Sequence, residues 1–254
     1  MKTLCVIPAR FASTRLPGKP LALIAGKPMI QWVYERAKQA DLIDKVVVAT
    51  DNNKIDAVVR EFGGQVVMTP ENLPSGTDRV AYVAQKENAE IVINLQGDEP
   101  FVSTELLNKM VQVFSNPEIE MATPVKKITE PGDLKNPNLV QVVRDNKHFA
   151  LYFSRSIIPY VRDIEKREDW INKQDFYKHI GIYAYRKHLL IKLTNLPQSG
   201  LESAEKLEQL RALENGIQIY TVETAYESVG VDTKEDLELV NNLIKHNKYE
   251  IDGV

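Results

Sequence analysis

The sequence predicts an α/β fold with a Rossmann-like, mostly parallel sheet flanked by helices, and three observations support this prediction. Four short runs rich in β-branched residues, at 4–7, 46–49, 65–68 and 91–95, are typical of buried strands. Helical stretches separate the runs, and such alternation predicts parallel strands joined by right-handed crossovers. The 254 residues are enough to bury the core of one α/β domain with a smaller lobe.

Several residues mark the expected helices. Pro28 suits a first helical position, after which Met29, Val33, Ala37 and Ala40 would line one face. Further helix boundaries are expected from a Ser103 cap on a helix ending near Phe114, from Gly216 beyond a helix that starts near Ala204, and from a capping box over Thr233–Asp236.

The second half of the chain has a more antiparallel pattern. Residues 140–144 and 148–153 flank an Asp-Asn-Lys turn and predict a hairpin. Residues 178–186 predict one further strand, in which Ile180, Ile182 and Ala184 alternate with Gly and Tyr residues. The highly charged residues 163–175 predict an exposed excursion.

Composition narrows the function classes. A formal charge of −3 with acids and bases interspersed argues against a nucleic-acid partner or a membrane surface. The residues before the first strand are too few for a signal-peptide core or a membrane span, so we expect a cytoplasmic protein. Cys5 is the only cysteine, which excludes a disulfide framework and a Cys-rich metal site.

The loop from Pro8 to Pro20 directly follows the first strand, where open α/β sheets bind ligands. Its three cations Arg10, Arg15 and Lys19 would neutralise a polyphosphate and stabilise a leaving pyrophosphate. The loop lacks the spacing of a Walker loop and of the dinucleotide Gly-x-Gly-x-x-Gly motif. On composition alone, the three cations could equally be solvated surface charges.

Two aspartates could bind a metal. Asp98 follows the strand at 91–95 and could share Mg²⁺ with phosphate oxygens, while Gly97 would let the backbone approach a base or sugar. The alternative is an ordinary Gly-Asp turn. Asp232 precedes the last helix and would complete the site if the chain folds back toward Asp98, although a helix cap is the simpler interpretation of Asp232 alone.

A set of polar residues in the second half suits a pocket for a hydroxyl-rich acidic sugar. In such a pocket Arg155 could bind a carboxylate and carboxylates could bind hydroxyls. The alternatives are a structural histidine and an exposed acidic helix face. The set comprises Arg155, His179, Tyr183, Glu202, Glu208, Gln209 and Arg211.

Seven motifs in order resemble those of the 3-deoxy-manno-octulosonate (Kdo) cytidylyltransferase family, also called CMP-Kdo synthetases. The resemblance covers nearly the whole chain, from Ile7 to the last helix. The motifs are Pro-Ala-Arg-x5-Leu-Pro-Gly-Lys-Pro from Pro8, Pro-Ser-Gly-Thr-Asp-Arg from Pro74, Gln-Gly-Asp-Glu-Pro from Gln96, Tyr-Phe-Ser-Arg-Ser-x-Ile-Pro from Tyr152, His-Ile-Gly-Ile-Tyr from His179, Leu-Glu-Gln-Leu-Arg from Leu207 and Gly-Val-Asp-Thr from Gly230.

The resemblance implies roles for residues in these motifs. CTP phosphates would be bound by Ala9, Arg10, Ser13, Arg15 and Lys19, and cytidine by Ser75, Arg79, Gln96 and Gly97, with Asp98 part of the same nucleotide site. Asp98 and Asp232 would bind magnesium, and together with Arg15 and Lys19 they form the expected catalytic set. The sugar acid would be bound by Arg155, His179, Tyr183, Glu202, Glu208 and Gln209.

The resemblance also implies a fold of the nucleotide-diphospho-sugar transferase type with a smaller mixed or antiparallel acceptor and dimerisation lobe. Within one domain (1–254) we expect a nucleotide-binding region at 1–115, an acceptor and dimerisation region at 116–228, and a metal-carboxylate strand end with the C-terminal helix at 229–254. The implied activity is CMP transfer from CTP to the anomeric 2-hydroxyl of Kdo for lipopolysaccharide synthesis, by a homodimer. Alternatives are transfer to 8-amino-Kdo or a sialic acid, or a non-catalytic nucleotide-binding module.

Overall fold

The computed structural model describes residues 1–12, 15–136 and 138–245. The chain forms two compact units, which are described one at a time: unit 1 is Met1–Leu107 with Ser228–Val254, and unit 2 is Asn108–Glu227. The units divide at residues 107 and 227, whereas the sequence suggested regions that divide at 115 and 228. The organisation of these regions as one domain stays a prediction.

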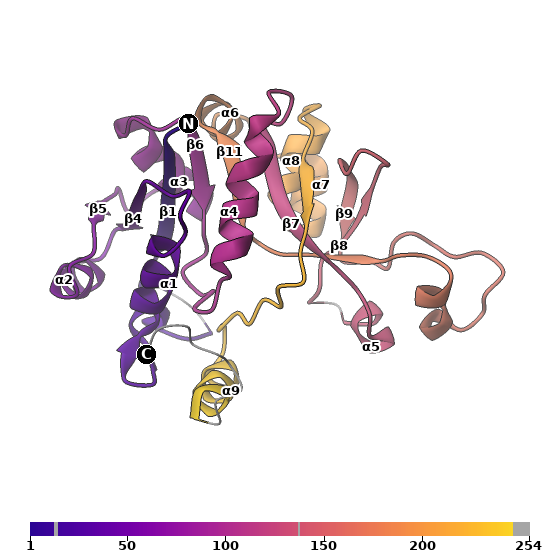
Figure 1. Cartoon of the computed structure of the whole chain (residues 1–254), viewed down its shortest axis with the longest axis horizontal. Coiled ribbons are helices and arrows are strands. Elements are labelled where there is room, and N and C mark those ends of the chain that lie inside the picture. Colours follow the sequence, from indigo (N-terminus) through magenta and orange to yellow (C-terminus); the bar gives the residue numbers. More distant parts are fainter. Residues whose placement is uncertain (13–14, 137, 246–254) are drawn as a thin grey trace. The chain divides into compact units, whose positions relative to one another are not determined.

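Unit 1 contains the four predicted strands, which lie side by side in Figure 1. Their order is β5 (Val66–Met68), β4 (Lys45–Thr50), β1 (Thr3–Ala9) and β6 (Ile91–Asn94), and all three pairings are parallel, as predicted. Connections from β1 to β4 and from β4 to β5 run in one direction, and the connection from β5 to β6 returns. The direction therefore changes between β1 and β6, and the carboxyl ends of these two strands mark the expected ligand position.

Three helices pack on this sheet: α1 (Met29–Lys38), α2 (Asn53–Glu61) and α3 (Gly76–Lys86). Met29, Val33 and Ala37 are buried on one face of α1, as predicted. The prediction for Pro28 is wrong by one position, because its ψ of 138° is extended and it caps the helix. That conformation lets Pro28 pair in the small hairpin of β2 (Leu23–Ile24) and β3 (Lys27–Pro28).

Two further helix predictions are confirmed. The Ser103 hydroxyl accepts the Leu106 backbone N–H at 3.2 Å and caps α4 (Thr104–Gln112), which continues as η2 (Val113–Ser115). Thr233 and Asp236 form the predicted capping box of α9 (Lys234–Lys245). Packing of α9 on unit 1 buries a cluster of Leu16, Ile24, Met29, Trp32, Phe101, Val231 and Val240, which fixes the segment before the helix.

Strand β7 (Met121–Lys127) is the most connected strand of unit 2. It pairs antiparallel with β10 (Tyr177–His179) and β11 (Tyr183–Arg186), and parallel with β12 (Tyr220–Glu223). The predicted hairpin is confirmed as β8 (Gln141–Arg144) and β9 (Ala150–Ser154), and β8 also pairs with β10. Unit 2 therefore has the mixed, mainly antiparallel sheet that the sequence suggested.

The prediction of one continuous strand over residues 178–186 is wrong, since β10 and β11 are separate. Five steps along the chain from His179 to Ala184 lie opposite three steps from Val125 to Ala122, so the chain bulges between the two strands. Pro124 lies opposite the bulge and has no N–H to donate. Proline within a sheet is usually confined to edges and bulges, which gives the physical reason.

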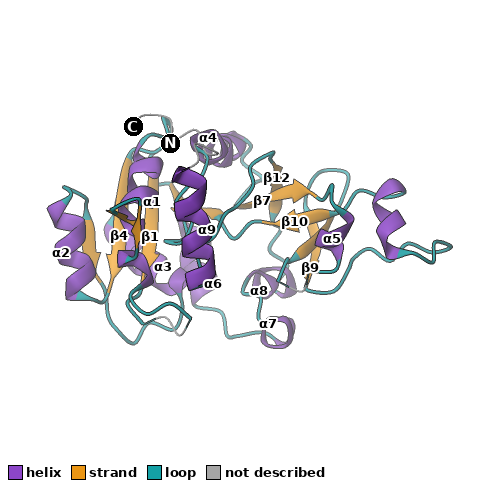
Figure 2. Cartoon of the chain, turned by 90° about the horizontal axis from the view of Figure 1, so that it is seen from below, coloured by secondary structure: helices purple, strands orange, loops and turns teal. Residues whose placement is uncertain are grey.

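The predicted single helix from about Ala204 is also wrong. Two helices, α7 (Gly200–Glu205) and α8 (Gln209–Glu214), follow α6 (Lys187–Thr194), and α8 contacts β9 (Figure 2). Lys206 has a left-handed φ of 56° and ends α7, because a left-handed residue cannot continue a right-handed helix. Gly216 follows α8 with a φ of 71°, as predicted for a residue just beyond a helix.

The charged residues 163–175 are only partly the exposed excursion that was predicted. Trp170, on η3 (Arg167–Asn172), is 2% exposed and packs in a small apolar cluster with Val161 and Phe176. Residues of α5 (Pro131–Leu134) complete this cluster through Leu134. Trp170, Ile164 and Ile171, which stand among the charged residues, supply apolar area that a count of charges does not reveal.

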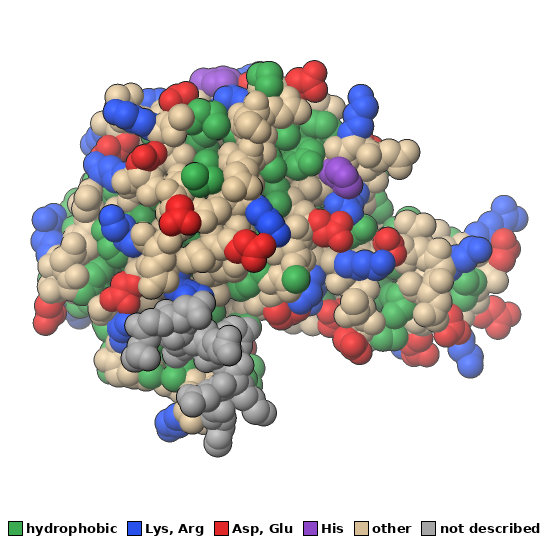
Figure 3. Space-filling model, in the orientation of Figure 1, with side chains coloured by type: hydrophobic (Ala, Val, Ile, Leu, Met, Phe, Trp, Pro, Cys, Tyr) green, Lys and Arg blue, Asp and Glu red, His purple; other side chains and the backbone are tan. Residues whose placement is uncertain are grey.

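Figure 3 shows acidic and basic side chains interspersed over the visible face, as the composition suggested. No helix in the described part of the chain has the length and apolar composition that a bilayer span requires.

Candidate functional site

A pocket of about 380 Å³ in unit 1 lies at the carboxyl ends of β1 and β6. Loops after the two neighbouring strands supply most of its wall, because the direction of the chain connections changes there. Gly76, the first residue of α3, and Asp232 complete the wall. The lining residues are Pro8, Ala9, Arg10, Ala12, Arg15, Lys19, Pro20, Gly76, Gln96, Gly97, Asp98 and Asp232.

Lys19 joins the two predicted metal carboxylates. Its Nζ lies 2.6 Å from Asp98 Oδ2 and 2.9 Å from Asp232 Oδ1. Burial would lower the pKa of Lys19, but the charges and hydrogen bonds of Asp98 and Asp232 outweigh it and raise the pKa above its ordinary value. The ammonium therefore stays protonated and cannot act as a base near neutral pH.

One backbone contact and one side-chain contact explain why Asp232 lies near Asp98. The Val231 N–H donates to the Asp98 carbonyl at 3.0 Å, and the Ser228 hydroxyl donates to the buried carboxylate of Glu99. Sequence reasoning missed Ser228 and Glu99, because no local pattern joins residues so far apart in the chain. The capping interpretation of Asp232 is wrong, since Thr233 and Asp236 form the cap.

The other predicted phosphate ligands also lie in this loop. The Arg15 guanidinium lies 3.1 Å from Asp232 Oδ2, and its side chain is 66% exposed, which leaves it accessible to a ligand. Arg10 donates through Nη2 to the Leu73 carbonyl at 2.7 Å, and its Nε is buried without a partner among the described residues. Ala9 lines the pocket, whereas Ser13 lies outside the described residues.

Gly97 and Gln96, which were predicted to contact the nucleotide, line the pocket. A Cβ added at Gly97 would lie 3.2 Å from the Pro8 carbonyl oxygen, closer than ordinary packing allows. The backbone of the β6 loop therefore approaches the β1 loop only because residue 97 lacks a side chain.

Two other predicted cytidine ligands, Ser75 and Arg79, do not line the pocket. The Ser75 hydroxyl donates to Asp78 Oδ2 at 2.7 Å and caps α3. Arg79 is fully buried, donates to Asp51 Oδ2 at 2.5 Å and also contacts Thr69. Gly76, the first residue of α3, lines the pocket instead. The Pro-Ser-Gly-Thr-Asp-Arg motif therefore contributes the start of α3 to the pocket wall, and not the side chains of Ser75 and Arg79.

In unit 2, His179 lies between aromatic rings. Its ring centroid is 5.2 Å from that of Phe153 and 5.3 Å from that of Tyr183. Burial lowers the pKa of His179 to about 3, so the imidazole is neutral at physiological pH. Burial and the charges of Tyr185 and Glu208 raise the pKa of Tyr183, which places Glu208 in the same surroundings.

Arg155 follows β9 and contacts Glu205. Its backbone N–H donates to Glu205 Oε2 at 3.1 Å, and its Nε donates to the Glu205 carbonyl at 3.0 Å. The Arg155 side chain lines a pocket of about 370 Å³ in unit 2, together with Leu134, Lys135, Asn136, Ser156, Ile157, Tyr160, Arg167 and Trp170.

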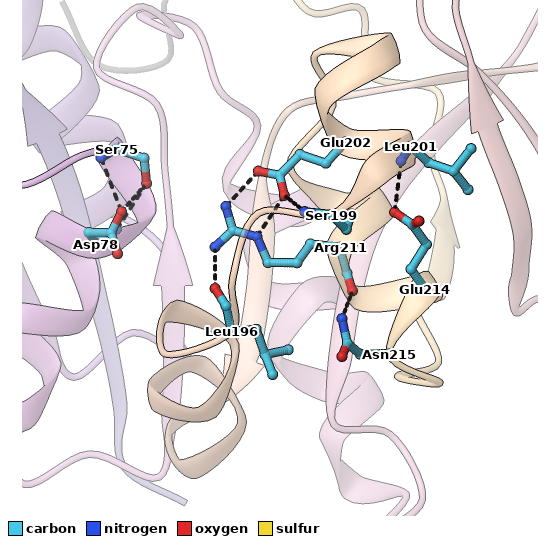
Figure 4. A network of polar contacts seen from close by, with 9 residues as sticks. All are labelled: Ser75, Asp78, Leu196, Ser199, Leu201, Glu202, Arg211, Glu214 and Asn215. Carbon is cyan, nitrogen blue, oxygen red and sulfur yellow. Dashed lines mark hydrogen bonds and ion pairs between the residues drawn. The ribbon is translucent and has the colours of Figure 1, made fainter.

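Glu202 is the predicted sugar ligand whose carboxylate is most fully engaged (Figure 4). Arg211 donates to it through Nε at 2.7 Å and Nη2 at 2.5 Å, and the Ser199 backbone N–H donates at 3.1 Å. Burial would raise the pKa of Glu202, but these hydrogen bonds and the charge of Arg211 lower it. The geometry gives Glu202 a structural function, joining α7 to α8.

Gln209, at the start of α8, is 5% exposed. Its Nε2 is buried without a hydrogen-bond partner among the described residues. A buried donor without a partner is costly, and a water molecule or a ligand can satisfy it.

The donor set of unit 1 fits a magnesium ion. No cluster of three His, Cys, Asp or Glu side chains within the described residues could hold a metal by itself. Magnesium, however, is usually held by one or two carboxylates and substrate phosphates. Asp98 and Asp232 already converge on one cation, the Lys19 ammonium, so their oxygens can bind a metal cation in its place.

Comparisons with known proteins agree with this geometry. The cytidylyltransferase family model matches residues 4–242. A 3-deoxy-manno-octulosonate cytidylyltransferase from Thermodesulfovibrio yellowstonii is 49% identical, covering 96% of this chain and 98% of its own, and one from Parabacteroides distasonis is 50% identical, covering 94% and 96%. The chain belongs to the 3-deoxy-manno-octulosonate cytidylyltransferase family.

Solved structures are also similar to the fold of this cytidylyltransferase. A CMP:2-keto-3-deoxy-manno-octonic acid synthetase complexed with CTP is 44% identical and superposes with a TM-score of 0.91, over 97% of this chain and 100% of its own. A 4-diphosphocytidyl-2C-methyl-D-erythritol synthase from Anaerococcus prevotii, 13% identical with a TM-score of 0.63 over 96% and 99%, shares the fold alone. The predicted nucleotidyltransferase fold is confirmed.

Proposed function

We propose that this cytidylyltransferase transfers CMP from CTP to the anomeric 2-hydroxyl of Kdo, giving CMP-Kdo and pyrophosphate and so activating Kdo for lipopolysaccharide synthesis. The observation that carries the proposal is one pocket in which Arg15 and Lys19 face Asp98 and Asp232. Solvated surface charges would not be arranged around a common pair of carboxylates. The relatives' shared name supplies the identity of the two substrates.

The reaction is an in-line displacement at the α-phosphorus of CTP. The 2-hydroxyl oxygen forms a bond to this phosphorus, the bond to the bridging oxygen of pyrophosphate breaks, and the hydroxyl proton is released to solvent. Arg15 and the protonated Lys19 would neutralise charge on the triphosphate as pyrophosphate leaves. Positioning and charge neutralisation supply most of the rate in transfers of this kind.

Asp98 and Asp232 would hold Mg²⁺ together with phosphate oxygens of CTP. When bound, the ion would neutralise these oxygens and lower the pKa of the attacking hydroxyl. Lys19 would then leave the carboxylates and turn its ammonium toward the phosphates, since two cations cannot share the same oxygens at close range.

The acceptor sugar would be bound by residues of unit 2. A neutral His179 and the phenol of Tyr183 offer hydrogen bonds to hydroxyls, and the buried Nε2 of Gln209 offers a donor to an acceptor oxygen. The exposed Arg155 suits the carboxylate of Kdo. Glu208 would accept hydroxyl donors, whereas Glu202 would support the helices that carry Glu208 and Gln209.

Pyrophosphate release tests the function. The assay compares CTP with Kdo, with 8-amino-Kdo, with N-acetylneuraminate and without sugar, each before and after EDTA treatment. We expect more release with Kdo than with 8-amino-Kdo or N-acetylneuraminate, loss with EDTA and recovery with Mg²⁺. Equal release with and without sugar would contradict the transferase, and a preference for N-acetylneuraminate or 8-amino-Kdo would reassign the acceptor.

We further propose that the enzyme is a homodimer formed through unit 2 and that it acts in the cytoplasm, where nucleoside triphosphates are made. The exposed Tyr160 and Leu151 of unit 2, at 76% and 62%, supply apolar surface for such a contact. Sedimentation equilibrium of the full chain distinguishes a dimer from a monomer.

A further inference from the structure

The hydroxyl of Thr123 lies beside the ring of His179 in unit 2. Thr123 is fully buried in β7, and its Oγ1 is 2.9 Å from His179 Nε2. The same Oγ1 lies 2.8 Å from the Ile182 carbonyl oxygen and 3.3 Å from the Ile180 carbonyl oxygen. One hydroxyl therefore has three polar neighbours, and only one hydrogen to share among them.

The two carbonyls decide where that hydrogen goes. A carbonyl oxygen can only accept, and two oxygens 2.8 Å apart repel each other unless a hydrogen lies between them. The Thr123 hydroxyl must therefore donate to Ile182. Toward His179 it can then only accept, so the imidazole nitrogen facing it must carry the proton.

The bulge between β10 and β11 produces this arrangement. Pro124 lacks an N–H, and the extra residues opposite it turn the carbonyls of Ile180 and Ile182 toward the Thr123 side chain. A continuous strand would use these carbonyls in its ladder. The bulge therefore fixes which way the Thr123 hydroxyl donates, and so which group it presents to His179.

We propose that Thr123 is a positioning residue that holds His179 in the Nε2–H tautomer, so that Nδ1 accepts a hydrogen bond from a hydroxyl of the acceptor sugar. No described residue bonds Nδ1, and His179 is half-buried. This inference rests on the proposed function for its ligand class, a polyhydroxylated acid, but the tautomer itself does not.

The direct test is nitrogen-15 NMR of the histidine side chains in the full chain without substrate. The sequence contains four histidines, and a His179→Gln variant identifies the signal of interest. We expect His179 to be neutral at pH 7, with Nε2 protonated and Nδ1 bare. A protonated Nδ1, or a doubly protonated ring, would overturn the proposal.

Kinetics with two substitutions test the consequence. Thr123→Val keeps the shape but removes the acceptor, so we expect a mixture of tautomers and a fall in kcat/KM for Kdo of roughly tenfold, the value of one hydrogen bond. KM for CTP should stay unchanged. Thr123→Ser keeps the hydroxyl and should restore both the tautomer and the sugar kinetics.

The outcomes separate this proposal from the proposed function. Wild-type spectra need neither turnover nor a second variant, so they decide the tautomer even if Thr123→Val fails to fold or no pyrophosphate is released. A Thr123→Val enzyme that keeps the Nε2–H tautomer, with unchanged Kdo kinetics, would overturn the role of Thr123 while leaving the transferase activity in place.

Discussion

The ion pairs at the pocket of unit 1 and those among the predicted sugar-binding residues of unit 2 differ in how far they are buried. In unit 1, Lys19 and Arg15 pair with Asp98 and Asp232 at a pocket wall, and the Arg15 side chain is largely exposed. In unit 2, the most complete ion pair joins Glu202 to Arg211, and the carboxylate is buried.

The difference separates ion pairs that a substrate can replace from ion pairs that hold the fold. Pairs at a pocket wall can be exchanged for phosphate or metal at little cost, because water and ligand reach them. A buried pair cannot lose one partner without leaving an uncompensated charge. Substitutions in unit 1 should therefore change catalysis, and the substitution of Glu202 in unit 2 should change stability.

The largest expected effect is that of Asp98→Asn on catalysis. The substitution removes one of the two carboxylates that converge on Lys19, and we expect kcat/KM to fall on the order of 10³-fold, the scale of losing one preorganised electrostatic group. Asp56→Asn is the matched control, since it breaks only the i,i+4 pair with Arg60 on α2. Near-normal turnover of Asp98→Asn would sink the assignment of the pocket.

Glu202→Gln should act mainly on stability. Removal of the carboxylate leaves Arg211 without its bidentate partner, and we expect the free energy of unfolding to fall by about 3 kcal/mol in urea denaturation. Glu214→Gln is the control on the same pair of helices, because Glu214 accepts a single hydrogen bond from the Leu201 N–H. Unchanged stability with a raised KM for Kdo would instead make Glu202 a ligand.

The same pair predicts a pH dependence. Because the pKa of Glu202 is lowered in the folded state, its contribution to stability is complete above the unfolded pKa of about 4.3 and is lost as pH falls through the folded value. The difference in unfolding free energy between wild type and Glu202→Gln should therefore shrink as the pH falls below about 4.3. A difference that stays constant to lower pH would contradict the ion pair.

Local patterns predicted most of the fold and less of the site. Runs of apolar β-branched residues predicted all four strands of unit 1, and short-range caps such as Thr233 with Asp236 located helix starts. The breaks at Lys206 and between β10 and β11 escaped prediction, because a left-handed φ at a lysine has no clear sequence signal. Pro124 within a strand was a usable signal for the bulge.

The site needed information of longer range. The meeting of Asp98 and Asp232 depends on packing of α9 and on contacts of residues far apart in the chain, so spacing could not predict it. Resemblance to a family supplied that link. The same resemblance could not distinguish Arg79, a buried partner of Asp51, from a side chain that lines the pocket, because both uses give the same motif.

Gly97→Ala should give the smallest effect and the finest test of the pocket wall. Its Cβ would lie 3.2 Å from the Pro8 carbonyl oxygen, so the two loops must separate by a few tenths of an ångström. Overpacking of this size costs about 1 kcal/mol, which corresponds to roughly a fivefold rise in KM for CTP. KM for Kdo should change less, since the strain arises at the nucleotide wall.

Gly132→Ala is the control for this substitution, because a Cβ there meets no atom within 4 Å and the residue belongs to unit 2. It should leave both KM values unchanged. If Gly97→Ala raised KM for Kdo and left KM for CTP unaltered, the β6 loop would contact the acceptor rather than the nucleotide. The division between a nucleotide pocket in unit 1 and sugar ligands in unit 2 would then have to be redrawn.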